Sequence, residues 1–157
     1  MFKKYYLAYG SNLNLHQMSY RCCNAKAIGS IELNNYRLVY KGSRDYLAYL
    51  TIEPNEGSMV PLGVFEVSSR DVNCLDEYEG YPTFYSKCYI PIKIGKKVKN
   101  ALMYVMNDQF DYNIPSVRYI NTCIEGYNDF GFDTTILDKA LEDTIDSKSK
   151  EKIYKKR

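Results

Sequence analysis

The sequence predicts an α+β fold in which a few helices accompany an antiparallel, barrel-like sheet. Apolar side chains recur at every second position in much of the stretch from residue 25 to 66, and the alternation returns between residues 86 and 106. This period is typical of β-strands. Helical patterns occur in separate segments and do not follow each predicted strand. The regular βα alternation of a parallel, doubly wound sheet is therefore missing, which favours the α+β class.

Composition and length narrow the possible classes of protein. A chain of 157 residues predicts one domain, which we place at residues 1–146. A net charge of +2 does not indicate a nucleic-acid partner, and no apolar run approaches the roughly 20 residues that cross a bilayer. The five cysteines form no Cys-x-x-Cys pair, and the N-terminus has no leader pattern. These features predict reduced thiols in a cytoplasmic protein without a structural zinc site.

The first predicted strand covers residues 4–8 and runs directly into the turn sequence Gly-Ser-Asn at residues 10–12. Asn14 is a favourable N-cap, and the apolar residues Leu15 and Met18 follow it at helical spacing. We therefore expect a strand, a turn and a short helix in close succession.

The middle of the chain predicts strands, a second helix and a hairpin. Turn residues interrupt the alternating pattern between residues 25 and 66, which predicts several antiparallel strands. Ser69 is the predicted N-cap of a helix over residues 70–79. Strands near 86–94 and 98–106 then form a hairpin around Gly95-Lys96-Lys97.

Two further helices and a tail complete the prediction. Pro115 opens a helix whose apolar residues share one face as far as Tyr127. A last helix begins near Asp133 and extends to about Ile145. Residues 147–157 are basic and almost without apolar side chains, which predicts a flexible C-terminal tail.

One carboxylate lies on the apolar side of the predicted second helix. At about 100° per residue, Leu75 projects roughly 60° from Val72, and Glu79 falls about 20° from Val72, between the two. Glu77 lies about 140° away, on the solvent side. A buried carboxylate favours its neutral form and can exchange a proton near neutral pH. The alternative is that the helix unwinds at Gly80 and lets the Glu79 side chain reach solvent.

Other candidate chemistries are less well supported. His16 is the only histidine and lies in a polar segment, which is typical of a surface residue. The pair Cys22-Cys23 is more typical of a core residue beside a partly exposed one than of a nucleophile. No Asp, Glu or His cluster has the spacing of metal ligands, and Gly-Ser-Asn matches neither a Walker loop nor a GxGxxG turn.

Three motifs in order resemble the γ-glutamylcyclotransferase-like family, which includes AIG2-like and butirosin-pathway relatives. The first is Tyr-Gly-Ser-Asn-Leu at residues 9–13, and the second is Leu-Asp-Glu-Tyr-Glu-Gly-Tyr-Pro at 75–82. The third starts with Pro-Ser-Val-Arg-Tyr at 115–119 and continues through Gly126-Tyr127 to Gly131. Together they cover most of residues 5–132.

The resemblance implies a small mixed, mainly antiparallel β-barrel with short helices and a cofactor-independent cyclase. In the family reaction, the α-amine of a γ-glutamyl amide attacks its own side-chain carbonyl, which gives 5-oxoproline and the free amine or amino acid. The family's acid/base falls on Glu79, and its substrate-binding loop falls on the first motif. Tyr119 matches a pocket tyrosine, and Tyr85 matches another if one gap is allowed. The substrate-binding residues are thus Tyr9, Gly10, Ser11, Asn12, Leu13, Tyr85 and Tyr119.

Two alternatives stay open at this point. The same cyclisation can act on a γ-glutamyl group linked to a carrier protein or to a lysine side chain. A non-catalytic module can also keep the fold and bind a small molecule without turnover. The sequence specifies neither the amine half of the substrate nor the oligomeric state.

Overall fold

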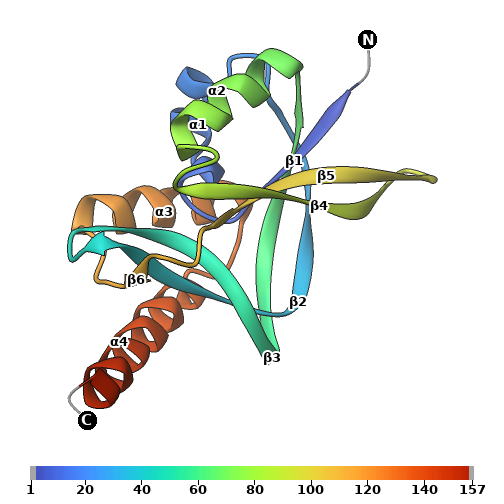
Figure 1. Cartoon of the computed structure of the whole chain (residues 1–157). Helices are drawn as coiled ribbons and strands as arrows, with labels where there is room; N and C mark the ends of the chain where they lie inside the picture. Colours follow the sequence, from blue (N-terminus) through green and yellow to red (C-terminus); the bar gives the residue numbers. More distant parts are fainter. Residues whose placement is uncertain (1–2, 156–157) are drawn as a thin grey trace.

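Six strands form one curled sheet in a computed structural model that describes residues 3–155, with the side chains of residues 3–153 (Figure 1). The strand order is β4-β5-β1-β3-β2-β6. Neighbouring strands run antiparallel except β1 and β5, which run parallel where Tyr6 pairs with Leu102. The strands are β1 (Lys4–Ala8), β2 (Lys26–Arg44), β3 (Leu47–Val67), β4 (Tyr85–Ile94), β5 (Lys97–Met106) and β6 (Asp111–Tyr112). The predicted fold class is confirmed.

The sheet curls into a half-barrel and leaves β4 and β6 as its two edges. The several short strands expected between residues 25 and 66 are instead two long strands, β2 and β3, that pair along most of their length. The register shifts three times, between Ala27 and Gly29, Asn34 and Tyr36, and Gly42 and Arg44. Bulges of this kind bend a strand without ending it. The turn residues in this stretch therefore mark bends as well as strand ends.

Helices follow the expected positions, with small shifts at their N-termini. They are η1 (Ser11–Leu13), a single 3₁₀ turn, and the α-helices α1 (Leu15–Arg21), α2 (Ser69–Glu79), α3 (Val117–Phe130) and α4 (Thr135–Lys155). Asn14 caps α1 as predicted. The cap of α2 is Ser68, one residue before the predicted Ser69, because Ser68 and Asp71 form a reciprocal capping box. Ser116, directly after Pro115, caps α3.

The last helix extends beyond the predicted start of the tail. Helix α4 continues to Lys155, so the predicted helix end near Ile145 was too early, and the flexibility of residues 147–157 stays a prediction. Ser147 Oγ accepts a hydrogen bond from Arg37 of β2, and Lys148 pairs with Asp45 at 2.5 Å. These contacts give the polar end of the helix partners on the sheet side. Residues 156 and 157 lie outside the described residues, and the domain at 1–146 stays a prediction.

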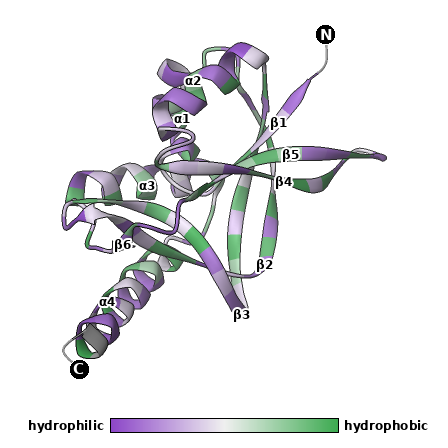
Figure 2. Ribbon diagram, viewed as in Figure 1, coloured by the Kyte–Doolittle hydropathy of each residue, from purple (hydrophilic) through white to green (hydrophobic). Residues whose placement is uncertain are grey.

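The core lies between the curled sheet and the helices that cover it. In Figure 2, apolar and polar residues alternate along parts of β2 and β3, as expected for strands with one buried face. Helices α1 and α2 lie at one end of the sheet, α3 packs beside them against the η1 turn, and α4 lies toward the other end against β2 (Figure 1). Within residues 3–155, no helix is both long and apolar enough to cross a membrane. All five cysteines are free thiols, and a cytoplasmic location stays a prediction.

Candidate active site

Glu79 lies in the last turn of α2 with its side chain half-buried, whereas Glu77 is exposed. Gly80 ends the helix in the left-handed conformation, at φ 65°, so the helix is intact up to Glu79. Burial raises the pKa of Glu79 from 4.5 to about 7, and the positive charge of Arg21 partly opposes that rise. The helical geometry therefore gave the correct side for both glutamates, and the side chain is not released to solvent.

The turn after β1 meets the end of α2. Asn12 Nδ2 donates to Glu79 Oε1 at 3.2 Å and to the Tyr6 hydroxyl at 2.9 Å. Ser11 Oγ and the Tyr78 hydroxyl are hydrogen-bonded at 3.1 Å. The contacts with Glu79 and Tyr78 each join residues 67 positions apart in the sequence. The first two motifs of the sequence thus form one site.

Helix α3 packs against the same turn, and the backbone of α3 at Gly126 lies close to the backbone at Leu13 and Asn14. A Cβ added to Gly126 would lie 2.6 Å from the backbone nitrogen of Asn14, so only glycine fits this position of α3. Asn14 Nδ2 also donates to the carbonyl of Thr122 and to Glu125 Oε2. The third motif therefore supports the turn that the first motif forms.

A cavity of about 400 Å³ opens between the turn, the end of α2 and the sheet. Six of the seven predicted substrate-binding residues line it together with Glu79: Tyr9, Gly10, Ser11, Asn12, Tyr85 and Tyr119. Leu13 does not, because its side chain is fully buried and packs over Gly63 of β3, where an added Cβ would lie 2.5 Å from Leu13 Cδ2. Leu13 therefore anchors the turn in the core, and its assignment to the substrate-binding set stays a prediction.

Tyrosine hydroxyls fix the backbone of the cavity wall. The Leu50 N–H in β3 donates to the Tyr119 hydroxyl at 3.0 Å, and the Tyr85 hydroxyl donates to the Leu50 carbonyl at 2.8 Å. The Tyr9 hydroxyl donates to the carbonyl of Tyr104 at 2.6 Å. Burial raises the pKa of Tyr9, Tyr85 and Tyr119 well above the ordinary value, so these hydroxyls stay neutral.

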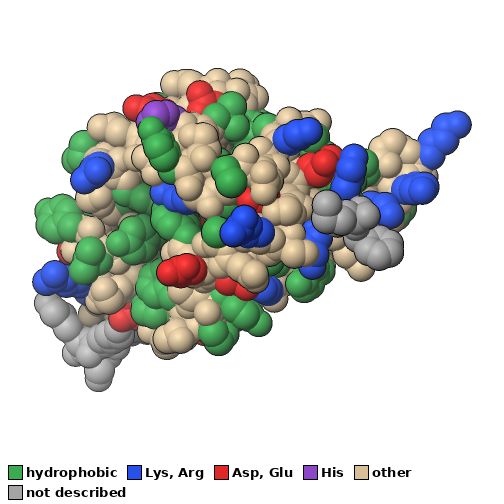
Figure 3. Space-filling model, turned by 90° about the horizontal axis from the view of Figure 1, so that it is seen from above, with side chains coloured by type: hydrophobic (Ala, Val, Ile, Leu, Met, Phe, Trp, Pro, Cys, Tyr) green, Lys and Arg blue, Asp and Glu red, His purple; other side chains and the backbone are tan. Residues whose placement is uncertain are grey.

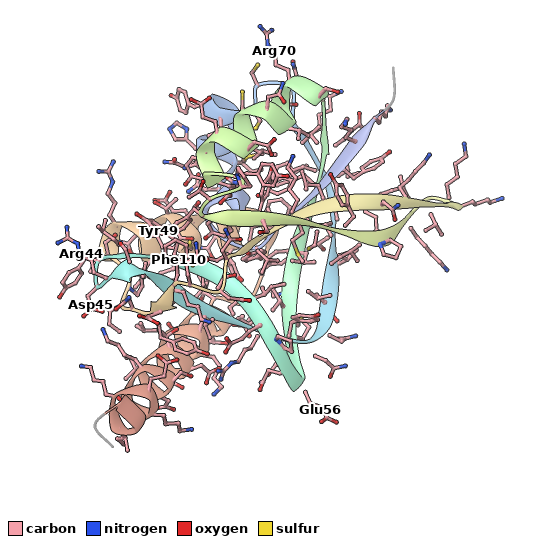
Figure 4. The ribbon with its side chains drawn as sticks, in the orientation of Figure 1. Arg44, Asp45, Tyr49, Glu56, Arg70 and Phe110 are labelled. Atoms are coloured by element: carbon pink, nitrogen blue, oxygen red, sulfur yellow. The ribbon has the colours of Figure 1, made fainter. Side chains whose placement is uncertain are left out.

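Several cavity residues were not predicted from the sequence. Tyr6 lies in β1, three residues before the predicted Tyr9, and no pattern in the sequence singled it out among the tyrosines. Tyr49 and Phe110, labelled in Figure 4, both contact the ring of Phe84. These aromatic residues come from separate elements, and no sequence spacing brings them together. The unpredicted lining residues are Tyr6, Tyr49, Leu50, Glu77, Tyr78, Gly80, Phe84 and Tyr104.

The remaining candidate groups from the sequence lie outside the cavity. His16 is exposed, as expected from its polar segment. Figure 3 shows Lys and Arg side chains distributed over the face seen from above, with several at its projecting end. No group of three or more His, Cys, Asp or Glu within the described part of the chain is placed to hold a metal ion. Independence from a metal or organic cofactor stays a prediction.

Comparisons with solved structures agree on the fold. A structure described as a gamma-glutamyl cyclotransferase matches with a TM-score of 0.72 at 22% identity, over 88% of this chain and 86% of that one. An uncharacterized protein from Homo sapiens matches with the same values. YkqA from Bacillus subtilis matches with a TM-score of 0.71 at 14% identity, over 90% of this chain and 55% of its own. No curated protein sequence matches significantly.

Fold and site together define an α+β protein with a single half-buried carboxylate in an aromatic cavity. The model of the family described as gamma-glutamyl cyclotransferase, AIG2-like, matches residues 6–121. The chain belongs to this family, and the resemblance inferred from its three motifs is confirmed.

Proposed function

We propose that this protein is a γ-glutamyl cyclotransferase that converts a γ-glutamyl amine or γ-glutamyl amino acid to 5-oxoproline and the free amine. The observation that supports this most is Glu79, a half-buried carboxyl with a pKa of about 7 on the wall of a cavity. A general base is most effective when its pKa is near the working pH. Glu79 meets this condition, and Glu77 lies exposed at the rim as a ready comparison.

Glu79 has two proton transfers to perform in this reaction. The substrate's α-amine arrives as an ammonium ion, and ionised Glu79 takes one proton from it. The freed amine nitrogen attacks the γ-carbonyl carbon and forms the new ring C–N bond. The tetrahedral intermediate then loses the amine of the original amide as the bond between the γ-carbon and that amide nitrogen breaks, and the departing nitrogen receives the proton from Glu79. The ring nitrogen gives up its second proton, which leaves on the released amine as an ammonium ion. Attacking and reacting groups belong to one molecule, so a cavity that holds the folded-back conformer supplies much of the rate.

The turn at residues 10–12 provides the means to bind the substrate's carboxylate. Among the described residues, no Lys or Arg side chain lines the cavity, and its charged residues are Glu77 and Glu79. A carboxylate therefore depends on N–H and O–H donors, and backbone amides in a tight turn form such an anion site. Gly10 keeps the turn open, because a Cβ there would lie 3.2 Å from the Tyr119 hydroxyl.

The test is a panel of γ-glutamyl compounds incubated with the purified protein, with 5-oxoproline measured by mass spectrometry. The panel contains γ-glutamyl amines, γ-glutamyl amino acids, a γ-glutamyl group on the ε-amine of lysine, and one on a carrier protein. We expect 5-oxoproline from at least one of them and none after Glu79→Gln, which keeps the shape but not the proton transfer. Glu77→Gln is the matched control and should retain activity.

The outcomes separate the alternatives. Product only from the carrier-linked or lysine-linked compound assigns the same cyclisation to a tethered substrate. Binding of 5-oxoproline or a γ-glutamyl compound without any product indicates a binding module. No product from any compound, or full activity in Glu79→Gln, refutes the proposed function.

A further inference from the structure

Arg21, the last residue of α1, lies behind the cavity wall in three contacts. Its Nη1 donates to Asn12 Oδ1 at 2.5 Å, and its Nη2 donates to Gln17 Oε1 at 2.8 Å. The guanidinium carbon lies 3.7 Å from the centre of the Tyr78 ring, a cation–π geometry. The Arg21 side chain is therefore held in one place without lining the cavity itself.

The contact with Arg21 determines which way the Asn12 amide points. A guanidinium only donates hydrogen bonds, so the atom that faces it must be the amide oxygen. The amide nitrogen then faces the other side, where Glu79 Oε1 and the Tyr6 hydroxyl accept from it. The Asn12 side chain thus has protein partners at both ends of its amide. The residue is only 2% exposed, so water has little access to it.

We propose that Arg21 is a positioning residue for Glu79, acting through the side-chain amide of Asn12. By holding the amide in one orientation, Arg21 directs an N–H donor at Glu79 Oε1 and steadies the carboxylate beside the substrate. This inference rests on the proposed function for its catalytic meaning, but the coupling between the three side chains is a property of the ligand-free protein.

Loss of Arg21 should raise the pKa of Glu79 for two reasons. The positive charge that opposes the effect of burial is removed. The Asn12 amide is also free to turn, and its oxygen facing Glu79 Oε1 repels an ionised carboxylate but accepts from a protonated one. Both changes favour the protonated form of Glu79, so its pKa rises.

The other groups that face Glu79 do not replace this effect. Five tyrosines approach it from β1, α2, β4, β5 and the turn after β1, and burial raises the pKa of each, so all are neutral: Tyr6, Tyr9, Tyr78, Tyr85 and Tyr104. Glu77 lines the same cavity and carries a like charge. Among the described residues, Arg21 is the cation that acts on Glu79.

The experiment compares Arg21→Met, Arg21→Lys and the control Gln17→Met, which removes the other hydrogen-bond partner of Arg21. Glu79 is titrated in the ligand-free proteins by ¹³C NMR of labelled glutamate carboxyls, with Glu79→Gln used for assignment. The pH dependence of kcat/KM for 5-oxoproline formation is measured in parallel, and near-ultraviolet circular dichroism checks that each variant is folded.

We expect Arg21→Met to raise the pKa of Glu79 by about one unit or more, a tenfold change in proton affinity. The rise of kcat/KM with pH should move to higher pH by the same amount. Arg21→Lys, which keeps the charge but not the planar fork, should give a smaller shift in the same direction. Gln17→Met should leave both curves in place.

The inference is wrong if folded Arg21→Met titrates like the wild type, or if Gln17→Met shifts Glu79 as strongly. Where Arg21→Met does not fold, Arg21→Lys and Asn12→Leu decide the question, because Asn12→Leu removes the N–H donor and should also raise the pKa. A protein that forms no 5-oxoproline but shows the NMR shift refutes the proposed function and leaves the coupling standing. A protein that forms 5-oxoproline but shows no NMR shift in Arg21→Met refutes the coupling alone.

Discussion

Glu79→Gln should make the protein more stable above neutral pH while removing its activity. The folded protein binds the Glu79 proton with a pKa of about 7, against an ordinary value of 4.5 in the unfolded chain. Because the folded state binds this proton more tightly, the free energy of unfolding falls as the pH rises from about 4.5 to about 7. At 1.36 kcal/mol per pH unit, the loss amounts to roughly 3 kcal/mol once Glu79 is ionised in both states. A neutral glutamine does not suffer this loss.

Urea unfolding at about pH 4.5 and about pH 8 measures the effect, with the slope m checked for constancy between proteins. At the lower pH, Glu79→Gln and the wild type should have similar free energies of unfolding. At the higher pH, the variant should be more stable by up to about 3 kcal/mol. The exposed Glu77→Gln should stay within about 0.5 kcal/mol at both. A variant that is equally stable, or less stable, at the higher pH refutes the argument that Glu79 is ionised at a cost in the folded protein.

Three further predictions concern the cavity. Because ionised Glu79 accepts the proton, kcat/KM for 5-oxoproline formation should rise with pH and level off above about 7. A profile that is flat from about pH 5 to about pH 9 contradicts this role. Tyr119→Phe removes the acceptor of the buried Leu50 N–H, so denaturant unfolding should show a loss of about 1–3 kcal/mol, against little change for Tyr89→Phe on the exposed face. Gly10→Ala places a Cβ 3.2 Å from the Tyr119 hydroxyl, so kcat/KM should drop at least about tenfold with a small change in thermal stability. Unchanged kinetics would count against the turn as the carboxylate site.

Local patterns predicted most of the elements of this fold. The period-two alternation and the turn at Gly95 give the β4–β5 hairpin within a residue at each end. The same alternation does not show whether a turn residue ends a strand or bends it, and Asn35 at φ 66° bends β2 within one continuous pairing. The end of α4 was predicted too early because its polar last turns gain partners from Arg37 and Asp45, which lie far away in the sequence.

The sequence likewise predicted some residues of the candidate site and missed others. Glu79 was found because a helix of known start and period places each residue on a definite side. The turn at residues 10–12 was recognised from its motif. Arg21 carried no signal, because its relation to Glu79 passes through Asn12 and depends on how α1 packs beside α2. Contacts of this kind depend on how separate helices pack, which local sequence patterns do not specify.

The two tyrosine hydroxyls on Leu50 also determine what shape of molecule the cavity admits. Leu50 pairs with Tyr40 on one side, and Tyr119 and Tyr85 occupy its N–H and carbonyl on the other. Those two groups are the ones that an incoming strand would use for β-strand addition. An extended peptide therefore finds no backbone partner at this point of the wall, whereas a short molecule folded back on itself needs none. At Leu50 the wall therefore presents side chains alone, and recognition of a bound molecule there falls to those side chains and not to the strand backbone.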